Sequence, residues 1–270
     1  MGLPPVSQAA GFRLTRVQIA FLLMAFAAPL GAAASQCTAL SGPHTTALVE
    51  LYTSEGCSSC PPADRWLSGL GTLGYVPAQV VPIALHVDYW DYIGWKDPYA
   101  KRDFSLRQRK LTQLQRLALV YTPQVMLQGR DFRGWGTPAF DKAVSRINAR
   151  PAAARIALEI AGADPKALRV RASAELAEHA KTADAALYLA AYENRLRSHV
   201  TAGENRGRML AHDYVVLEWQ GPFELSSGTL QTERLMPLLP GAVPTNSGVV
   251  AFLQDRRTGE VLQALMLPAC

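Results

Sequence analysis

The sequence predicts an α/β domain followed by an antiparallel β-sandwich-like domain. Between residues 44 and 150, apolar strand-like runs alternate with segments of helical periodicity. Between residues 154 and 270, short runs with a period near two follow one another and are separated by turn residues. A chain of 270 residues is long for one domain and suits two. We therefore expect domains at 44–150 and 154–270.

The first segment alternates strands and helices in a regular order. Two prolines, Pro61 and Pro62, open its first helix, because proline is tolerated in a first helical turn. The expected elements are a strand at 46–53, a helix at 61–70, a strand at 80–87, an aromatic and acidic loop at 88–99, a helix at 104–119, a strand at 125–128, a short extended stretch at 131–135 and a helix at 138–149.

A C-x-x-C pair, Cys57 and Cys60, lies where the first strand meets the first helix. The positive end of a helix dipole lowers the pKa of a thiol placed there and favours the reactive thiolate. Thr122 and Pro123 precede a later strand. This element order matches the thioredoxin fold, in which a cis-proline loop before a core strand packs against the cysteines. The first domain is therefore predicted to be thioredoxin-like, with Cys57 as the more exposed nucleophile, Cys60 as the resolving thiol and Thr122-Pro123 as the substrate loop.

His86, Asp88 and Trp90 follow the second strand and are expected near the cysteine loop. Ligands bind outside the carboxyl ends of strands in open α/β sheets. His86 and Asp88 have three interpretations: a proton shuttle, a third metal ligand beside two thiolates, or a hydrogen bond that orders the aromatic loop. The last is favoured. Trp90 either rims a peptide groove or packs down as part of a lid.

The second segment, residues 154–270, is predicted to form a series of short strands. A polar, glycine-containing stretch at 193–194 and 199–212 interrupts them, and an ordinary surface hairpin is the favoured interpretation. The alternative is a hairpin that folds back and contributes Asn205, Arg206 and Arg208 to a shared groove. The expected strands cover 156–160, 167–173, 185–192, 214–219, 228–233, 249–253 and 261–266.

Residues 1–34 have the pattern of a cleaved export signal. Arg13 and Arg16 precede an apolar run, and a run of alanines offers a cleavage site after Ala34. We therefore expect a periplasmic or secreted bacterial protein with no stable membrane span after cleavage. Loss of the two arginines lowers the formal charge from +5 to +3. This mild charge, without a basic stripe, excludes nucleic acid as the expected partner.

The other two of the four cysteines, Cys37 and Cys270, lie near the two ends of the expected mature chain. Disulfides persist outside the cytosol, and chain termini often lie close together. A structural Cys37–Cys270 disulfide is therefore predicted, and two free thiols are the alternative.

Several motifs resemble one bacterial family of secreted proteins with a thioredoxin-like domain, catalogued as a domain of unknown function. They are Val49–Asp64 with its S-E-G-C-S-S-C-P-P-A-D run, His86–Asp91, Gly94–Pro98, Tyr121–Gln124, Gly203–Arg208 and His212. The resemblance implies the family and its fold. It implies no substrate, because the family has no assigned reaction.

The leading functional hypothesis is an exported thiol–disulfide oxidoreductase that uses Cys57 and Cys60 on a protein partner, with no cofactor and no resident metal. Four residues closed by a disulfide constrain the unfolded chain little, so a purely structural staple is a weak explanation of the pair. Two alternatives remain: a Cu(I)-binding protein that uses Cys57, Cys60 and His86, and a redox-inert interaction module. The sequence does not settle the direction of electron transfer.

Overall fold

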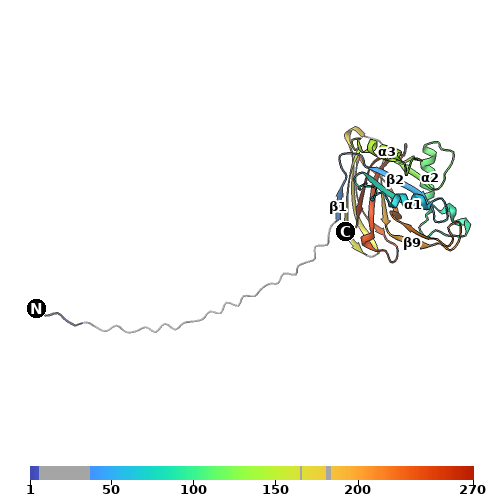
Figure 1. Ribbon diagram of the computed structural model, residues 1–270. Coiled ribbons are helices and arrows are strands. Elements are labelled where there is room, and N and C mark those ends of the chain that lie inside the picture. Colours follow the sequence, from blue (N-terminus) through green and yellow to red (C-terminus); the bar gives the residue numbers. More distant parts are fainter. Residues whose placement is uncertain (6–36, 165, 181–183) are drawn as a thin grey trace. The chain divides into compact units, whose positions relative to one another are not determined.

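The folded chain is organised around one large mixed β-sheet (Figure 1). The structure is a computed structural model, and it describes residues 1–5, 37–164, 166–180 and 184–270. The predicted export signal, residues 1–34, lies outside this range except for its first five residues. The strands of the large sheet are β2 (Ala47–Thr53), β3 (Val80–His86), β4 (Gln124–Leu127), β5 (Arg130–Asp131), β8 (Ala185–Glu193), β11 (Val215–Glu224), β13 (Ser247–Asp255) and β14 (Val261–Pro268). Within the described residues their order is β14–β13–β8–β11–β3–β2–β4–β5.

Helices cover both faces of the sheet where β2 and β3 run parallel. Alternate side chains of a strand point to opposite faces. Val49 and Leu51 pack with helices α1 (Pro61–Ser68) and α3 (Pro138–Asn148), whereas Leu48 and Tyr52 pack with α2 (Arg102–Leu114). Both strands are buried along their whole length, as expected for a parallel pair with two covered faces. Their carboxyl ends, Thr53 and His86, are paired and bring the following loops together.

The helices begin and end where local sequence chemistry dictates. Pro61 and Pro62 occupy the first turn of α1. The hydroxyl of Thr137 accepts a hydrogen bond from the backbone N–H of Ala139 at 3.3 Å and caps α3. Helix α2 ends at Leu114, earlier than the sequence predicts, and Arg116 beyond it has a left-handed φ of 56°. The aromatic loop contains a 3₁₀ turn at Asp88–Ile93.

An ion pair fixes α2 to the sheet. The Arg107 guanidinium donates to both carboxylate oxygens of Glu50, at 2.6 and 3.0 Å, and Tyr52 donates to the same carboxylate at 2.9 Å. Arg107 also donates to the Gln254 side chain at 3.1 Å, and its guanidinium carbon lies 4.8 Å from the ring centroid of Trp219. This clamp ties a helix of the first predicted domain to strands of the second.

A second, four-stranded antiparallel sheet packs on the β8–β13–β14 part of the large sheet. The shared core contains Ile156, Leu158 and Val170 from the small sheet with Leu187 and Val249 from the large one. Its strands, in the order β1–β6–β7–β12, are β1 (Cys37–Leu40), β6 (Ala154–Asp164), β7 (Ala167–Leu176) and β12 (Thr229–Pro237). A separate hairpin of β9 (Leu196–His199) and β10 (Met209–His212) lies against α1.

The predicted fold class, a thioredoxin-like α/β domain followed by a β-sandwich-like domain, is wrong. Strand residues outnumber helical residues, and one mixed sheet contains strands from both halves of the chain. The join is a parallel pairing of β11 with β3 at Val215 and Ala84. Local periodicity identifies strands but not distant partners, so the sequence placed these strands in separate structures. The boundary at residues 150–154 stays a prediction.

The two ends of the folded part are joined covalently. Cys37 in β1 and Cys270, which are 233 positions apart in sequence, form a disulfide with their Cα atoms 5.9 Å apart. The backbone N–H of Cys270 also lies 2.9 Å from the Cys37 sulfur. The chain therefore contains the long-range disulfide that the sequence predicts.

Candidate functional site

The candidate site is the turn that links β2 to α1 and carries the second disulfide. Cys57 and Cys60 are bonded, with Cα atoms 5.4 Å apart, and Cys60 is the N-cap residue of α1. Both cysteines are 0% exposed, whereas Ser58 and Ser59 between them are exposed. The expectation that Cys57 is the more exposed thiol is therefore wrong for this oxidised, closed conformation.

The β9–β10 hairpin covers the cysteine turn. The buried Asn205 amide donates to the backbone carbonyls of Glu55 and Cys57, at 2.8 and 2.9 Å. The Glu204 carboxylate accepts from the backbone N–H of Ser58 at 2.9 Å, and the Ser58 side chain together with this backbone N–H lowers the pKa of Glu204. The sequence favoured an ordinary surface hairpin here. The structure instead folds the hairpin back onto the cysteines.

Of the three hairpin residues named in the alternative prediction, two take part in this contact. Asn205 bonds the cysteine turn, and Arg208 donates to the Asn205 side-chain oxygen at 3.0 Å. Arg206 is exposed and uses only its backbone in the hairpin turn. Arg208 therefore orients the amide that holds the hairpin closed.

The aromatic loop closes the other side of the turn. A Cβ atom added at Gly56 would lie 3.1 Å from the Cβ of Trp90 and 3.3 Å from Ile93, so only glycine fits without a shift of these side chains. The Trp90 indole N–H donates to the Thr122 hydroxyl at 2.7 Å, next to the cis Thr122–Pro123 peptide. Trp90 therefore packs down onto the site and connects the cysteine turn to the predicted substrate loop.

Behind the turn lies a group of ionisable side chains that we call the buried histidine cluster. No member is more than 6% exposed. It consists of Glu55, Asp64, His86, Asp97 and His212.

Short contacts connect the members of the buried histidine cluster. His86 Nδ1 and Asp97 Oδ2 are 2.7 Å apart, and the same oxygen accepts from the backbone N–H of Glu55 at 2.8 Å. His212 Nε2 is 3.1 Å from Glu55 Oε1, and its Nδ1 is 4.0 Å from Asp64 Oδ2. The two imidazole ring centroids are 4.9 Å apart. The cluster thus forms one electrostatic unit.

Burial and mutual charge shift the pKa values in this cluster. Burial raises the pKa of Asp64, and the neighbouring His212 and His86 only partly offset this effect. Burial alone would lower the pKa of His86, but the facing Asp97 carboxylate outweighs it and the pKa is raised. Burial alone would raise the pKa of Asp97, but His86 and backbone N–H donors hold it below its usual value. The His86–Asp97 pair is therefore stabilised in its charged form.

Three polar atoms of the cluster have no hydrogen-bond partner among the described residues. They are Asp64 Oδ1, His86 Nε2 and His212 Nδ1, and they come from α1, β3 and β10. A buried polar group without a partner costs about 1–3 kcal/mol. Such groups are rare in native structures, and each calls for an explanation, such as strain, a bound water or a catalytic role.

The sequence analysis found part of this site and missed the rest. His86 lies in the cluster, but Asp88 does not. Asp88 turns towards α2, where its carboxylate accepts from the Ser105 hydroxyl and its backbone N–H donates to that hydroxyl at 3.2 Å. Asp97 takes the place expected for Asp88. Asp64 was detectable as an acid one helical turn after Cys60, and His212 as a polar residue that ends a predicted hairpin.

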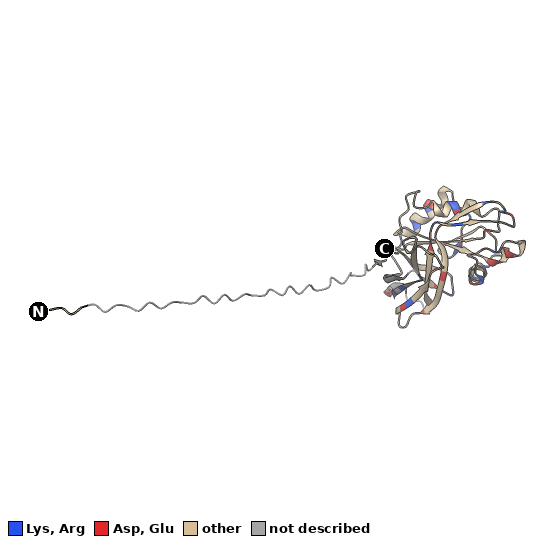
Figure 2. Ribbon diagram, turned by 90° about the horizontal axis from the view of Figure 1, so that it is seen from below, with Lys and Arg blue, Asp and Glu red and all other residues tan. Residues whose placement is uncertain are grey.

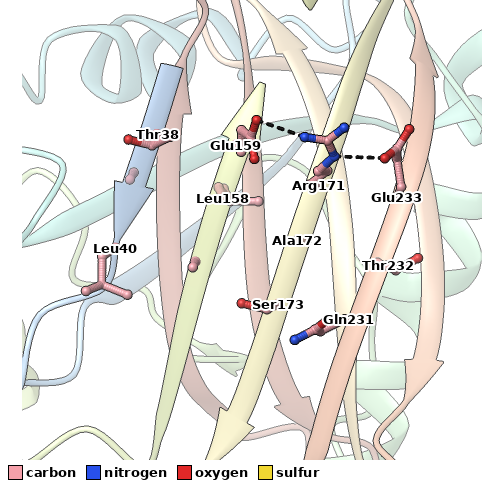
Figure 3. A pocket seen from close by; sticks show the side chains of 12 residues that line it. Thr38, Leu40, Leu158, Glu159, Arg171, Ala172, Ser173, Gln231, Thr232 and Glu233 are labelled. Carbon is pink, nitrogen blue, oxygen red and sulfur yellow. Dashed lines mark hydrogen bonds and ion pairs between the residues drawn. The ribbon is translucent and has the colours of Figure 1, made fainter. Parts of the chain in front are cut away.

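A surface hollow lies elsewhere. It has a volume of about 730 Å³ and lies on the outer face of the four-stranded sheet (Figure 3). Arg171 crosses it and pairs with Glu159 and Glu233, at 3.1 and 2.8 Å. None of its lining residues is a cysteine or a histidine. It therefore offers no chemistry comparable to that of the cysteine turn.

Overall charge and metal-ligand geometry give no second candidate for a reactive site. Figure 2 shows Lys and Arg together with Asp and Glu on the folded part, in keeping with cross-strand pairs such as Arg169–Glu233. Among the described residues, no group of three or more His, Cys, Asp or Glu side chains is arranged to hold a metal ion. No helix in the described part of the chain is both long and apolar enough to cross a membrane.

Comparisons with solved structures bear on the fold alone, because the sequence identities are low. A crystal structure of a protein from Agrobacterium tumefaciens matches with a TM-score of 0.59 and 22% identity, and the match covers 84% of this chain and 96% of that one. HBP35 of Porphyromonas gingivalis matches with a TM-score of 0.64 and 16% identity, covering 84% of this chain and 76% of that one.

The family is identified by sequence. No curated protein matches the chain significantly. A family model described as a protein of unknown function, DUF1223, matches residues 48–254, which include the cysteine turn, all five members of the buried histidine cluster and the covering hairpin. The chain therefore belongs to this family of proteins of unknown function.

Proposed function

We propose that this protein is an exported thiol–disulfide oxidoreductase that uses the Cys57–Cys60 disulfide on a protein partner. The observation that carries the proposal is the position of this disulfide. It joins the N-cap residue of α1 to the turn before it, beside the buried histidine cluster. A helix N-terminus stabilises a thiolate and so favours the leaving group that disulfide exchange requires.

The two disulfides differ in what they can do for stability. Cys57 and Cys60 are only three residues apart, whereas 233 residues separate Cys37 from Cys270. In the chain-entropy account, the stabilisation by a disulfide grows with the length of the loop that it closes. The long-range disulfide supplies most of this stabilisation, so a second, local staple adds little. This contrast favours an exchange role for the Cys57–Cys60 pair.

The reaction is a balanced exchange. A thiolate of a partner dithiol attacks the Cys57 sulfur, the Cys57–Cys60 bond breaks, and Cys60 leaves as a thiolate that takes up a proton. The second partner thiol loses its proton and attacks the mixed disulfide, which releases Cys57 as a thiol. The partner is oxidised to a disulfide and the protein is reduced to a dithiol. The reverse sequence reduces a partner disulfide.

Access to the sulfurs requires a conformational step. Both cysteines are covered in the closed conformation, and Asn205 and Glu204 hold the hairpin over them. Opening of the hairpin would break the hydrogen bonds from Asn205 and to Glu204 and expose the cysteine turn. The same cover favours one competing function, a redox-inert interaction module in which the disulfide is never attacked. Copper binding by the reduced cysteines stays an alternative prediction from the sequence.

The test is exchange with a peptide dithiol, followed by the rate of peptide disulfide formation. We expect the wild-type protein to react and Cys57→Ala and Cys60→Ala to be inactive. The double variant Cys37→Ala/Cys270→Ala is the matched control, because it also lacks one disulfide but keeps the turn. A wild-type rate no higher than that of Cys57→Ala would overturn the proposal and favour the inert module.

A further inference from the structure

We propose that a second site, which we call the α3 pocket, binds a small amphiphilic carboxylate, that is, one carboxylate group on a short apolar chain. The α3 pocket lies between residues 127–132 and residues 143–150, next to Glu260, where the edge strand β5 meets α3. Its volume of about 430 Å³ falls within the range of about 300–1,000 Å³ that is common for ligand pockets. None of its described lining residues belongs to the cysteine turn or to the buried histidine cluster, so this inference is independent of the proposed exchange function.

One part of the lining is apolar. Leu127 is 6% exposed, and Phe132, Ala143 and Ile147 are half-buried against the core under α3. The Phe132 ring also packs edge-on against Phe140, with the centroids 6.2 Å apart. An apolar chain placed against these side chains leaves water, which strengthens binding by about fourfold for each buried methylene group.

The charged part of the lining has an excess of arginine. Arg130, Arg146 and Arg150 line the α3 pocket together with two acids, Asp131 and Glu260. Arg150 and Glu260 form an ion pair at 3.2 Å. Three cations against two carboxylates leave a net charge of +1 in the lining. This charge matches a single carboxylate and disfavours a phosphate dianion.

The other acid, Asp131, has its own partners. The Tyr121 hydroxyl and the Gln124 amide donate to its Oδ1 at 2.7 and 2.9 Å. The Arg133 side chain donates to its Oδ2 at 3.3 Å. These donors hold both oxygens of the Asp131 carboxylate, so it is not a counter-ion for Arg130.

Two arginines of the α3 pocket thus have no carboxylate partner in the described part of the chain. Arg130 makes no side-chain hydrogen bond or ion pair there, and the Arg146 guanidinium donates only to the Lys142 carbonyl, at 3.3 Å. A guanidinium offers a planar fork of donors that fits a carboxylate in bidentate fashion. Arg130 belongs to β5 and Arg146 to α3, so the two sides of the α3 pocket each supply one free fork.

The β4–β5 side of the α3 pocket is fixed without the arginines. The buried Gln128 side chain accepts from the Leu48 backbone N–H at 2.7 Å and donates to the Val261 carbonyl at 3.1 Å. At Gly129, with a φ of +75°, an added Cβ would lie 1.9 Å from the carbonyl oxygen of Gly259. The β4–β5 turn therefore packs directly against the β13–β14 turn.

The α3 side is fixed as well. The Asn148 amide, at the end of α3, donates to the backbone carbonyls of Thr45 and Gln79, at 2.9 and 3.0 Å. Both sides are therefore held in place before a ligand arrives. A preformed pocket loses little conformational freedom on binding, which favours affinity for a small ligand.

The experiment is an NMR titration of the isotopically labelled, fully oxidised protein with butanoate, hexanoate and octanoate at constant ionic strength. We expect saturable binding, with amide shifts concentrated at residues 127–132 and 143–150. Affinity should rise by about fourfold for each added methylene between butanoate and hexanoate. Octan-1-ol, which has the apolar chain of octanoate without its charge, should bind at least about tenfold more weakly than octanoate.

Paired variants identify the groups that bind each end of the ligand. Arg130→Gln and Arg146→Gln should each weaken octanoate binding by about tenfold. The control is Lys142→Gln, which removes a cation from an exposed position of α3 outside the pocket lining and should leave the affinity unchanged. Ile147→Asn places a polar group in the apolar part and should abolish the gain in affinity from butanoate to octanoate.

Three results would overturn the proposal. They are the absence of saturable octanoate binding, amide shifts centred outside the α3 pocket, and an affinity that neither Arg130→Gln nor Arg146→Gln lowers more than Lys142→Gln does. Arg130 and Arg146 are exposed, so their substitution tests binding in a protein that keeps its fold.

Discussion

Two buried ionic groups lie on opposite faces of the large sheet, and they are built differently. Glu50 of β2 faces α2 and forms the clamp with Arg107, whereas His86 of β3 faces the opposite side and belongs to the buried histidine cluster. In the clamp, two guanidinium bonds and the Tyr52 hydroxyl satisfy the carboxylate. The buried histidine cluster has two imidazoles for three carboxyl groups, and three of its polar atoms have no hydrogen-bond partner in the part of the chain that the structure describes.

Under the proposed function, the difference separates a structural group from one that takes part in the chemistry. A buried pair with all hydrogen bonds made has one stable arrangement of protons. A buried group of ionisable side chains with shifted pKa values beside a disulfide is a candidate functional site. The clamp should therefore govern stability, and the buried histidine cluster should govern chemistry.

The largest expected effect comes from breaking the clamp. Arg107→Met leaves the Glu50 carboxylate buried without its cation and should lower the free energy of unfolding by about 3–5 kcal/mol. Denaturant titration measures this loss. Lys110→Met, on the exposed face of the same helix, should change stability by less than about 0.5 kcal/mol. A loss below about 1 kcal/mol for Arg107→Met would show that the clamp is not structural.

A smaller change in the free energy of unfolding, of opposite sign, is expected for the buried histidine cluster on the other face of the large sheet. Asp64→Asn removes a carboxyl group whose burial raises its pKa, so the folded protein should gain roughly 0.5–2 kcal/mol at neutral pH. The measurement is the same denaturant titration. If Asp64→Asn lowered the free energy of unfolding as much as Arg107→Met, the buried histidine cluster would have the same structural role as the clamp.

The next effect concerns the hairpin over the cysteines. Asn205→Ala removes two hydrogen bonds to the turn, each worth about 0.5–1.5 kcal/mol net, and should raise the rate of disulfide reduction by dithiothreitol roughly tenfold. Arg197→Ala, at an exposed position of β9, serves as the control. An unchanged rate for Asn205→Ala would mean that the hairpin opens without breaking these bonds.

The smallest effect is a pH dependence of stability. It is expected for His86, on one face of the large sheet, and not for Arg107, on the other. Because the pKa of His86 is raised on folding, its contribution to stability is complete below about pH 6.5 and is lost as the pH rises through the folded-state pKa. The stability difference between wild type and His86→Asn should therefore shrink above neutral pH. The cost of Arg107→Met should stay constant over the same range, since arginine remains protonated. Denaturant titrations of the wild type and of both variants at several pH values across this range measure the two costs.

Local sequence chemistry made part of the fold and of the candidate site predictable. Proline at helix starts, alternation in strands and the C-x-x-C spacing placed most elements and the disulfide turn. The pairing of Val215 with Ala84 depends on how distant segments meet, and no local pattern contains it. Likewise, Asp88 and Asp97 both follow His86 closely. The loop reverses at Gly94, with a φ of +96°, and so delivers Asp97 to the imidazole while Asp88 turns towards α2.

The disulfide between Cys37 and Cys270 makes the folded part a covalently closed ring. One cut in the backbone of an exposed loop, such as that after β12 at residues 239–243, opens this ring without producing two separate fragments. A protease that nicks the protein there leaves a single covalent molecule until a reductant acts. The same closure means that new chain ends could be placed in such a loop and Cys37 joined to Cys270 by a short linker, a circular permutation for which these two residues already lie close enough.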